Sequence, residues 1–313
     1  MIEVQEDLVT EIEQLKRERN AVILAHNYEP GPVQDLADFV GDSLAMARWA
    51  ERSPARTLVV AGVYFMAETA AILSPEKTVL IPDPSAGCSL AESITVEQLI
   101  EWKQQFPDAV VVSYVNTSAA VKALSDYCCT SSNAVKVVQQ IDPEKAILFL
   151  PDFFLGSHVA RQTGRKNIQV WMGECHVHAG IDAETLVATA HAHPGAEVLV
   201  HPECGCTTRA LALPPEGVPT HVLSTDGMIS HSHTSTAKSF IVATEIGLLH
   251  RLRKENPEKE FLAASEEALC PFMNRISVEK IRDGLRDLKF VVEVPEAIRQ
   301  RALIPLERMV AIG

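Results

Sequence analysis

The chain has 313 residues, and its 28 Lys and Arg against 41 Asp and Glu give a formal charge of −13 at pH 7. Such a charge argues against nonspecific binding to nucleic acid or to an anionic membrane surface, although helix N-termini can still bind small anions. The composition, 47% apolar and 22% charged, is that of an ordinary globular protein of two or three domains. No apolar run approaches the ~20 residues that span a bilayer, so we expect a protein of the reducing cytoplasm, whose cysteines serve as ligands, nucleophiles or packing residues.

Residues 1–20 predict an amphipathic, charged helix that lacks the apolar segment of a signal peptide. After it, short runs rich in Val, Ile, Leu and Ala alternate with amphipathic stretches. Continuous apolar runs predict strands buried on both faces, and their alternation with helices predicts α/β units with parallel sheets. The predicted strands are 21–27, 57–63, 78–83, 109–116, 146–152, 168–173, 196–203, 221–225, 240–245 and 260–264.

Three of these strands end in polar side chains at an almost constant interval. His26 and Tyr114 are 88 residues apart, and Tyr114 and His201 are 87 apart. Such periodicity indicates repeated supersecondary units. We therefore expect three homologous α/β/α sandwich domains around a pseudo-threefold axis, at 1–90, 91–177 and 178–284, with 285–313 packed against the first. The third is longer because of a Pro/Gly-containing loop at 205–220.

The carboxyl ends of parallel strands are where ligands bind, so these polar groups are expected to converge on one cavity. Histidine and glutamate there suit proton transfer near pH 7. A serine opens each following helix and either caps it or adds an anion site. Any one of these groups alone could be structural. The candidates are His26, Tyr28, Ser43, Tyr114, Asn116, Ser131, His201, Glu203, Ser224 and Thr225.

One lone cysteine follows the last strand of each unit. Cys88, Cys175 and Cys270 come 45, 44 and 46 residues after the serine of their own unit. Three thiolates can hold an iron-sulfur cluster and leave one iron without a protein ligand, which can then act as a Lewis acid. A zinc site completed by His176 or His178 is the alternative.

The remaining cysteines and histidines have less defined roles. Cys128 and Cys129, expected on a helix or loop, are interpreted as packing residues or redox-sensitive thiols, and the roles of Cys204 and Cys206 stay open. Five histidines have no counterpart in the repeat and are interpreted as surface or capping residues: His191, His193, His231, His233 and His250. Walker-type and Gly-x-Gly-x-x-Gly phosphate loops are absent from the sequence, which argues against ATP or NAD chemistry.

Several motifs resemble one known family, quinolinate synthase of NAD biosynthesis, in order from about residue 22 to residue 281. The motifs in the first two units are AHNY at 25–28, DFVGDS at 38–43, FMAETA at 65–70, AGCSLA at 86–91, SYVNTSAAVKA at 113–123 and CCTSSNA at 128–134. Those in the third are HPEC at 201–204, STDGM at 224–228 and ATEIG at 243–247.

The resemblance implies a transferase-type, condensing and dehydrating enzyme of pyridine nucleotide biosynthesis. Members of the family condense iminoaspartate with dihydroxyacetone phosphate to quinolinate, with loss of phosphate and water. They carry a [4Fe-4S] cluster on three cysteines, which match Cys88, Cys175 and Cys270. The resemblance places the strand-end and serine candidates on substrate-binding positions, with Tyr28, Tyr114, His201 and Glu203 as catalytic groups. An aspartate-oxidising enzyme would supply the iminoaspartate.

Two rival functions stay open from the sequence. One is another iron-sulfur hydro-lyase that uses an open iron on a different acid. The other is a zinc-stabilised binding protein without catalysis, which leaves the strand-end histidines, tyrosines and glutamate unexplained. Some family members have a Cys-x-x-Cys-x-x-Cys segment near the third ligand, whereas this chain has only Cys270 there, so regulation by a local disulfide is not expected.

Overall fold

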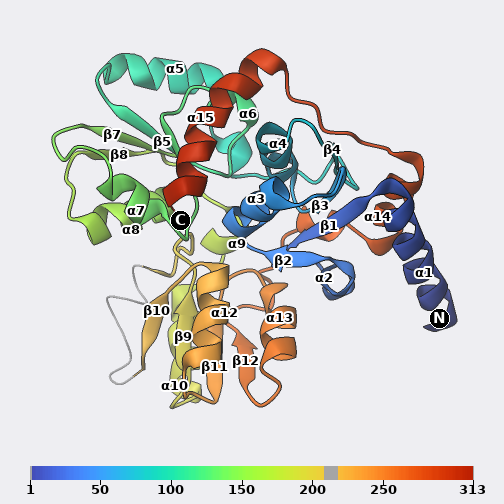
Figure 1. The fold of residues 1–313 in the computed structure, drawn as a ribbon. Helices are drawn as coiled ribbons and strands as arrows, with labels where there is room; N and C mark the ends of the chain where they lie inside the picture. Colours follow the sequence, from blue (N-terminus) through green and yellow to red (C-terminus); the bar gives the residue numbers. More distant parts are fainter. Residues whose placement is uncertain (1, 208–217, 313) are drawn as a thin grey trace.

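A computed structural model describes residues 2–207 and 218–312. Its strands form three parallel four-stranded sheets (Figure 1). In each sheet the first strand lies between the second and the third. The orders are β2-β1-β3-β4, β6-β5-β7-β8 and β10-β9-β11-β12. The repeated topology confirms the prediction of three α/β units, which rests on sequence spacing alone.

In the first unit, β1 is buried between helices, as its uninterrupted apolar sequence predicts. The strands are β1 (Ala21–His26), β2 (Phe39–Gly41), β3 (Thr57–Ala61) and β4 (Thr78–Leu80). The helices are α1 (Ile2–Arg19), α2 (Gly31–Leu36), α3 (Ser43–Arg52), α4 (Tyr64–Leu73) and η1 (Ala91–Ser93). The predicted N-terminal helix is thus confirmed as α1.

The second unit repeats this arrangement. Its strands are β5 (Val110–Tyr114), β6 (Tyr127–Cys129), β7 (Ile147–Leu150) and β8 (Ile168–Val170). Its helices are α5 (Val96–Gln105), α6 (Ala119–Lys122), α7 (Ala134–Gln139), α8 (Phe153–Thr163) and α9 (His176–Ala179).

The third unit has strands β9 (Glu197–Val200), β10 (Thr220–Val222), β11 (Ser239–Ala243) and β12 (Glu260–Ala263). Its helices are α10 (Ala183–Ala192), α12 (Thr225–Thr234) and α13 (Leu248–Glu255), followed by η2 (Met273–Arg275). Most of the loop expected at 205–220 lies outside the described residues. The predicted strand at 221–225 is shorter than expected, because Ser224 caps α12 and Thr225 already belongs to that helix.

All ten predicted runs contain a strand, but two strands were missed. These are β2 and β6, whose apolar residues end directly at Asp42 and Thr130 and therefore form no longer apolar run. The equally short edge strands β4, β8 and β10 were recognised because apolar residues continue beyond each of them. An aspartate directly before each of β2 and β6 bonds to the neighbouring strand of its sheet. Asp38 accepts the Ile23 N–H at 2.8 Å in the first unit, and Asp126 accepts the Val111 N–H at 2.8 Å in the second.

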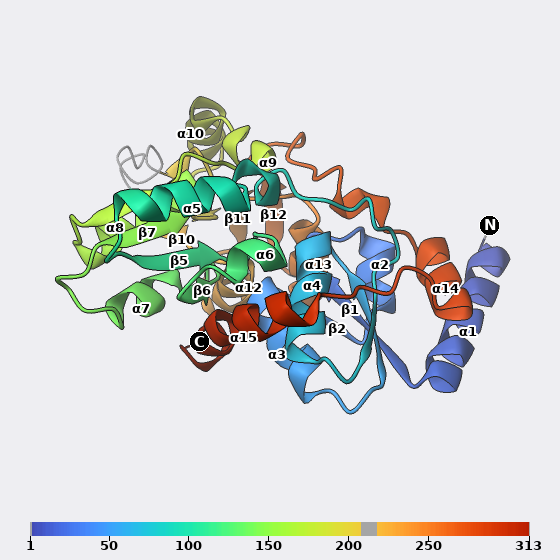
Figure 2. The same cartoon turned by 90° about the horizontal axis from the view of Figure 1, so that it is seen from above.

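The C-terminal segment packs against the first and second units, both far from it in the sequence. Val291 forms an antiparallel bridge with Leu80 at the edge of the first sheet. Helix α14 (Val278–Asp287) packs on α1, whereas α15 (Glu296–Ile312) packs on α3 and α4 of the first unit and on α6 and β6 of the second (Figure 2). The segment therefore contacts both units. The expected domain boundaries stay a prediction.

None of the described helices is long and apolar enough to cross a membrane.

Candidate functional site

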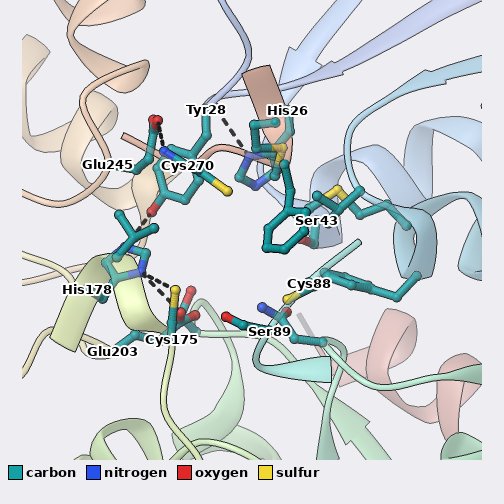
Figure 3. A pocket seen from close by; sticks show the side chains of 18 of the residues that line it. His26, Tyr28, Ser43, Cys88, Ser89, Cys175, His178, Glu203, Glu245 and Cys270 are labelled. Atoms are coloured by element: carbon teal, nitrogen blue, oxygen red, sulfur yellow. Dashed lines mark hydrogen bonds and ion pairs between the residues drawn. The ribbon is translucent and has the colours of Figure 1, made fainter. Parts of the chain in front are cut away.

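All three units contribute to one cavity at the carboxyl ends of their sheets (Figure 3). Of the thirteen predicted site residues, twelve line this cavity, and Ser224 is the exception. The lining residues used below are His26, Tyr28, Ser43, Cys88, Tyr114, Asn116, Ser131, Cys175, His178, His201, Glu203, Thr225, Glu245 and Cys270. The structure thus brings together groups separated by more than two hundred residues, which is what the repeat and strand-end pattern predicted.

The three cysteines occupy equivalent positions, each in the loop after the outermost strand of its sheet. Cys88 follows β4, Cys175 follows β8, and Cys270 follows β12. Figure 3 shows their side chains directed into the same cavity. All three are free thiols that are neither fully buried nor fully exposed.

Each of these sulfurs accepts the same pair of hydrogen bonds from the backbone. The N–H groups two and three residues further along the chain bond to the thiol, from Leu90 and Ala91 in the first unit. Val177 and His178 supply them to Cys175, and Phe272 and Met273 supply them to Cys270. Such donors stabilise a thiolate, the form that binds metal.

Burial opposes ionisation of the same thiols. It raises the pKa of Cys88 to about 12 and raises the pKa of Cys175 and Cys270 as well. Three partly buried thiols with backbone N–H donors already in place are therefore suited to a metal centre, whose positive charge replaces the protons. The donor set fits an iron-sulfur cluster held by three sulfurs.

For the alternative of a zinc site, one of the two histidines considered as the fourth ligand, His178, lies next to a cysteine. His178 Nδ1 is 3.3 Å from the Cys175 sulfur, and Cys175, His178 and Glu203 form a group whose ligand atoms all lie within 4.8 Å of one another. The other histidine considered, His176, instead bonds through Nδ1 to the Ser89 hydroxyl at 2.7 Å.

Two histidines at equivalent strand ends adopt the same turn. The Tyr28 N–H donates to His26 Nδ1 at 3.2 Å, and the Glu203 N–H donates to His201 Nδ1 at 3.4 Å. Burial lowers the pKa of His26 to about 3 and that of His201 well below its ordinary value. A neutral ring that accepts at Nδ1 carries its proton on Nε2, so both histidines are neutral hydrogen-bond donors.

Glu203 is the centre of a buried network. The Tyr114 hydroxyl donates to its Oε1, and His178 Nδ1 lies 3.5 Å from its Oε2. Burial raises the pKa of Glu203 to about 7, although the hydrogen bond from Tyr114 opposes the rise. A carboxyl with a pKa near 7 can take up and release a proton at neutral pH.

The tyrosines extend this network toward the first unit. The Tyr28 hydroxyl is 2.5 Å from Thr244 Oγ1 and 3.2 Å from His178 Nε2. Burial, followed by the charge of Glu203, raises the pKa of both Tyr28 and Tyr114 well above its ordinary value. Both phenols therefore stay protonated at neutral pH.

The helix-start groups differ from the prediction in detail. In α3 the cap is Asp42, which accepts the Ala45 N–H at 2.8 Å, and Ser43 is the first helical residue. Ser131 precedes α7 by more than one residue, since Asn133 is the N-cap, and its hydroxyl lies 3.2 Å from His201 Nε2. The expectation that Ser131 opens a helix was therefore wrong, although its hydroxyl does line the cavity.

Ser224 is the one serine of the three that caps its helix itself. Its hydroxyl accepts the Gly227 N–H at 3.2 Å, and its neighbour Thr225 faces the cavity. Thr225 is held by Asn27, whose amide donates to Thr225 Oγ1 at 2.9 Å. The predicted substrate contact of Ser224 stays a prediction. Within the described part of the chain the lining contains no Lys or Arg, so anions would have to bind to hydroxyls and backbone N–H groups.

Sequence reasoning missed Glu245 as a site residue. Its Oε1 accepts the Cys270 N–H at 3.0 Å and its Oε2 accepts the Gly247 N–H at 2.6 Å, so it fixes the third cysteine loop. Burial raises the pKa of Glu245 to about 7. A signal was available, because Asp152 and Glu245 each lie two residues beyond the third strand of their unit.

The other cysteines are packed away from the cavity. Cys128 and Cys129 lie on strand β6, not on the expected helix or loop, and both are fully buried. Cys204 and Cys206 are joined by a disulfide with an S–S distance of 2.10 Å. The expectation that the cysteines form no disulfide therefore fails for this pair, whose individual roles the sequence left open; both are also buried packing residues of the third unit.

Comparison with known proteins identifies the family. The sequence profile described as "Quinolinate synthetase A protein" matches residues 10–311. A quinolinate synthase of Thermus thermophilus is 55% identical over 308 residues, 98% of each chain. Quinolinate synthase of Mycobacterium tuberculosis strain H37Rv is 52% identical over 316 residues, all of this chain and 90% of the relative. With a profile match over nearly its whole length and relatives above half identity, this chain belongs to the quinolinate synthetase A family.

Proposed function

We propose that this protein is an enzyme that condenses iminoaspartate with dihydroxyacetone phosphate to quinolinate, releasing one phosphate and two waters. The observation that carries the proposal is the set of three equivalent cysteines, each with the same pair of backbone donors, around a cavity that also holds Glu203. The names of the relatives support the same reaction.

Cys88, Cys175 and Cys270 would hold a [4Fe-4S] cluster as its three protein ligands. When bound, such a cluster supplies Lewis-acid chemistry at the iron that no cysteine holds. The overall reaction has no net oxidation or reduction. Electron transfer is therefore not required of the site.

The chain's own residues would bind the anionic groups of the substrates. Ser43 and Thr225 lie in the first turns of α3 and α12, where backbone N–H groups other than those of Ala45 and Gly227, which Asp42 and Ser224 accept, would receive carboxylate or phosphate. Ser131 and Asn116 add hydrogen-bonding groups from the second unit. The neutral His26 and His201 can donate Nε2–H to a carbonyl or carboxylate oxygen without adding charge.

Glu203 would move the protons. Carbon–carbon bond formation and the loss of water both need a group that removes a proton from carbon and returns one to oxygen, and a pKa near 7 suits both directions. The Tyr114 hydroxyl, bonded to Glu203 Oε1, holds the carboxyl and can relay its proton. His201, Tyr28 and the intervening His178 would orient substrate and complete the relay.

The test is an anaerobic assay of pyridine dicarboxylate formation from both substrates, with metal analysis of the same preparation. The wild type should contain about four irons per chain and turn over both substrates. Ala variants of Cys88, Cys175 and Cys270 should lose both, whereas the matched control Cys128→Ala should keep both, since Cys128 lies on β6 outside the lining.

Other outcomes separate the rivals. A colourless protein with one tightly bound zinc would favour the zinc-binding alternative through His178. An intact cluster that converts a different hydroxy acid but not these two substrates would favour another hydro-lyase. Retention of cluster and activity by any of the three cysteine variants would contradict the ligand assignment.

We also propose that iminoaspartate reaches this enzyme in the cytoplasm from an aspartate-oxidising enzyme. The imine is the two-electron oxidation product of the aspartate amine, so an oxidase or dehydrogenase acting on aspartate is the class of reaction that must precede this one.

A further inference from the structure

A second cluster of metal-binding side chains lies in the third unit, away from the cavity. Glu197 is the first residue of β9, His221 is the central residue of β10, and His231 lies in the last turn of α12. The cavity residues of the same elements, His201 and Thr225, lie at the opposite ends. Four residues of strand or six of helix separate the two places, about 9–13 Å.

Both imidazoles present the same nitrogen to the same oxygen. Glu197 Oε2 is 2.5 Å from His231 Nε2 and 3.6 Å from His221 Nε2, and the ring centroids are 4.1 Å apart. All three ligand atoms lie within 4.8 Å of one another. Two histidine nitrogens and one carboxylate form a donor set that binds zinc and related divalent metals in other proteins.

Two further features distinguish this cluster from an ordinary ion pair: a hydrogen bond that orients Glu197, and a buried histidine nitrogen without a hydrogen-bond partner among the described residues. The Ser235 hydroxyl donates to Glu197 Oε1 at 2.9 Å, which orients the carboxylate and leaves Oε2 for the histidines. Such support behind a ligand is typical of metal sites. His221 Nε2 is inaccessible to solvent, and among the described residues it has no hydrogen-bond partner. A cation between these three atoms would satisfy it.

We propose that Glu197, His221 and His231 bind one divalent transition metal of the zinc class, independently of the three cysteines. The side chains of Glu197, His221 and His231 are 17%, 35% and 24% exposed, so the cluster lies near the surface, where water can complete the coordination of an ion, while His221 Nε2 itself points inward. Ligand bonds of about 2.0–2.1 Å in a tetrahedron separate ligand atoms by about 3.3 Å, so the Glu197–His231 pair opens by about 0.8 Å.

The metal would join β9, β10 and α12 at the end of the unit opposite the cavity. Because β9 leads directly into His201 and α12 begins at Thr225, fixing their far ends restrains the elements that carry site residues. The role is structural. Quinolinate formation itself does not depend on the proposal.

Equilibrium dialysis of the anaerobic, iron-loaded enzyme against Zn²⁺ in metal-free buffer tests the site, with zinc and iron counted in the same sample. The wild type should take up one zinc per chain without losing iron, and its thermal midpoint should rise. His221→Ala and His231→Ala should each weaken zinc binding at least tenfold, and Glu197→Gln should do the same. His233→Ala is the matched control, since His233 lies on the same helix but pairs with Glu255.

Unchanged zinc affinity in the His221→Ala/His231→Ala double variant would overturn the proposal, and so would a wild type that takes up no zinc at 100-fold excess. Should an alanine variant unfold, His231→Gln keeps a side chain that can still hydrogen-bond Glu197. Loss of zinc binding in a folded His231→Gln protein would support a metal site, and full retention would refute it. Iron content and quinolinate formation in the same variants report separately on the proposed function.

Discussion

Glu29 allows a quantitative test of the electrostatics next to the site. It lies in the turn between β1 and α2, and its side chain is fully buried. Within the described part of the chain neither carboxyl oxygen has a hydrogen-bond partner. Burial first, and then the charge of Glu245, raise the pKa of Glu29 well above its ordinary value of 4.5. The folded protein therefore holds Glu29 as a neutral acid in a range where the unfolded chain ionises it.

The cost of this protonation follows from linkage. Below pH 4.5 both states are protonated and the cost is absent. Above it, folding must take up a proton, and each pH unit costs about 1.4 kcal/mol until the folded pKa is reached. Glu29 thus destabilises the fold increasingly as the pH rises above 4.5. Glu29→Gln removes the titration while keeping the shape and the unpaired polar atoms, so the variant should be more stable than the wild type above pH 4.5, and the gain should increase with pH.

The assay is urea unfolding of wild type and Glu29→Gln at pH 5.5 and 6.5, at equal ionic strength and matched iron content. The stability gain of the variant should be larger at pH 6.5 than at pH 5.5, by at most about 1.4 kcal/mol. Glu76→Gln is the control, because it makes the same chemical change at a side chain that is 67% exposed. A gain for Glu29→Gln that is the same at both pH values would refute the reasoning, since Glu29 would then be ionised in the fold.

Three further predictions follow: two concern glycines in the packing of the fold, and one concerns a surface ion pair. In Gly247→Ala the new Cβ would lie 2.6 Å from the Tyr28 carbonyl oxygen, so unfolding should become easier by about 1–3 kcal/mol and activity should fall. Gly284→Ala, in open space within α14, should instead stabilise by about 0.5–1 kcal/mol in the same urea titration. Against the effect of burial, hydrogen bonds from Lys280 and Ser85 lower the pKa of Asp83 to about 2. Asp83→Asn should therefore cost about 1 kcal/mol at pH 7, with solvent screening, and the difference should vanish as the pH falls from 3.8 toward 2. Equal stabilities at pH 7 would contradict this.

The amino-acid sequence determined the repeat and the three cysteines. Strands such as β1 are buried on both faces, so their apolar runs are continuous and easily recognised. The strand ends recur at an almost constant interval, and the offsets of 45, 44 and 46 residues from serine to cysteine make Cys88, Cys175 and Cys270 equivalent positions. The family motifs supplied substrates and metal centre, which the spacing could not.

Two of the short edge strands, β2 and β6, were not recognisable from the sequence. Strand β6 consists of Tyr127, Cys128 and Cys129 between the polar residues Asp126 and Thr130, so no longer apolar run marks it. Its place in the sheet depends on parallel pairing with β5 and on Asp126, which accepts the Val111 N–H. Pairing between segments distant along the chain is a tertiary property, and local propensity does not encode it.

The tertiary structure alone decided which polar groups touch. It set the neutral Nε2–H form of His26 and His201, because burial and a backbone N–H donor act together on each ring. It also revealed Glu245 behind Cys270 and grouped His231, interpreted from the sequence as a surface or capping residue, with Glu197 and His221. Sequence spacing located the ends of strands, whereas proton positions and ligand sets depend on side chains that approach across units within a few ångströms, where burial shifts their charge.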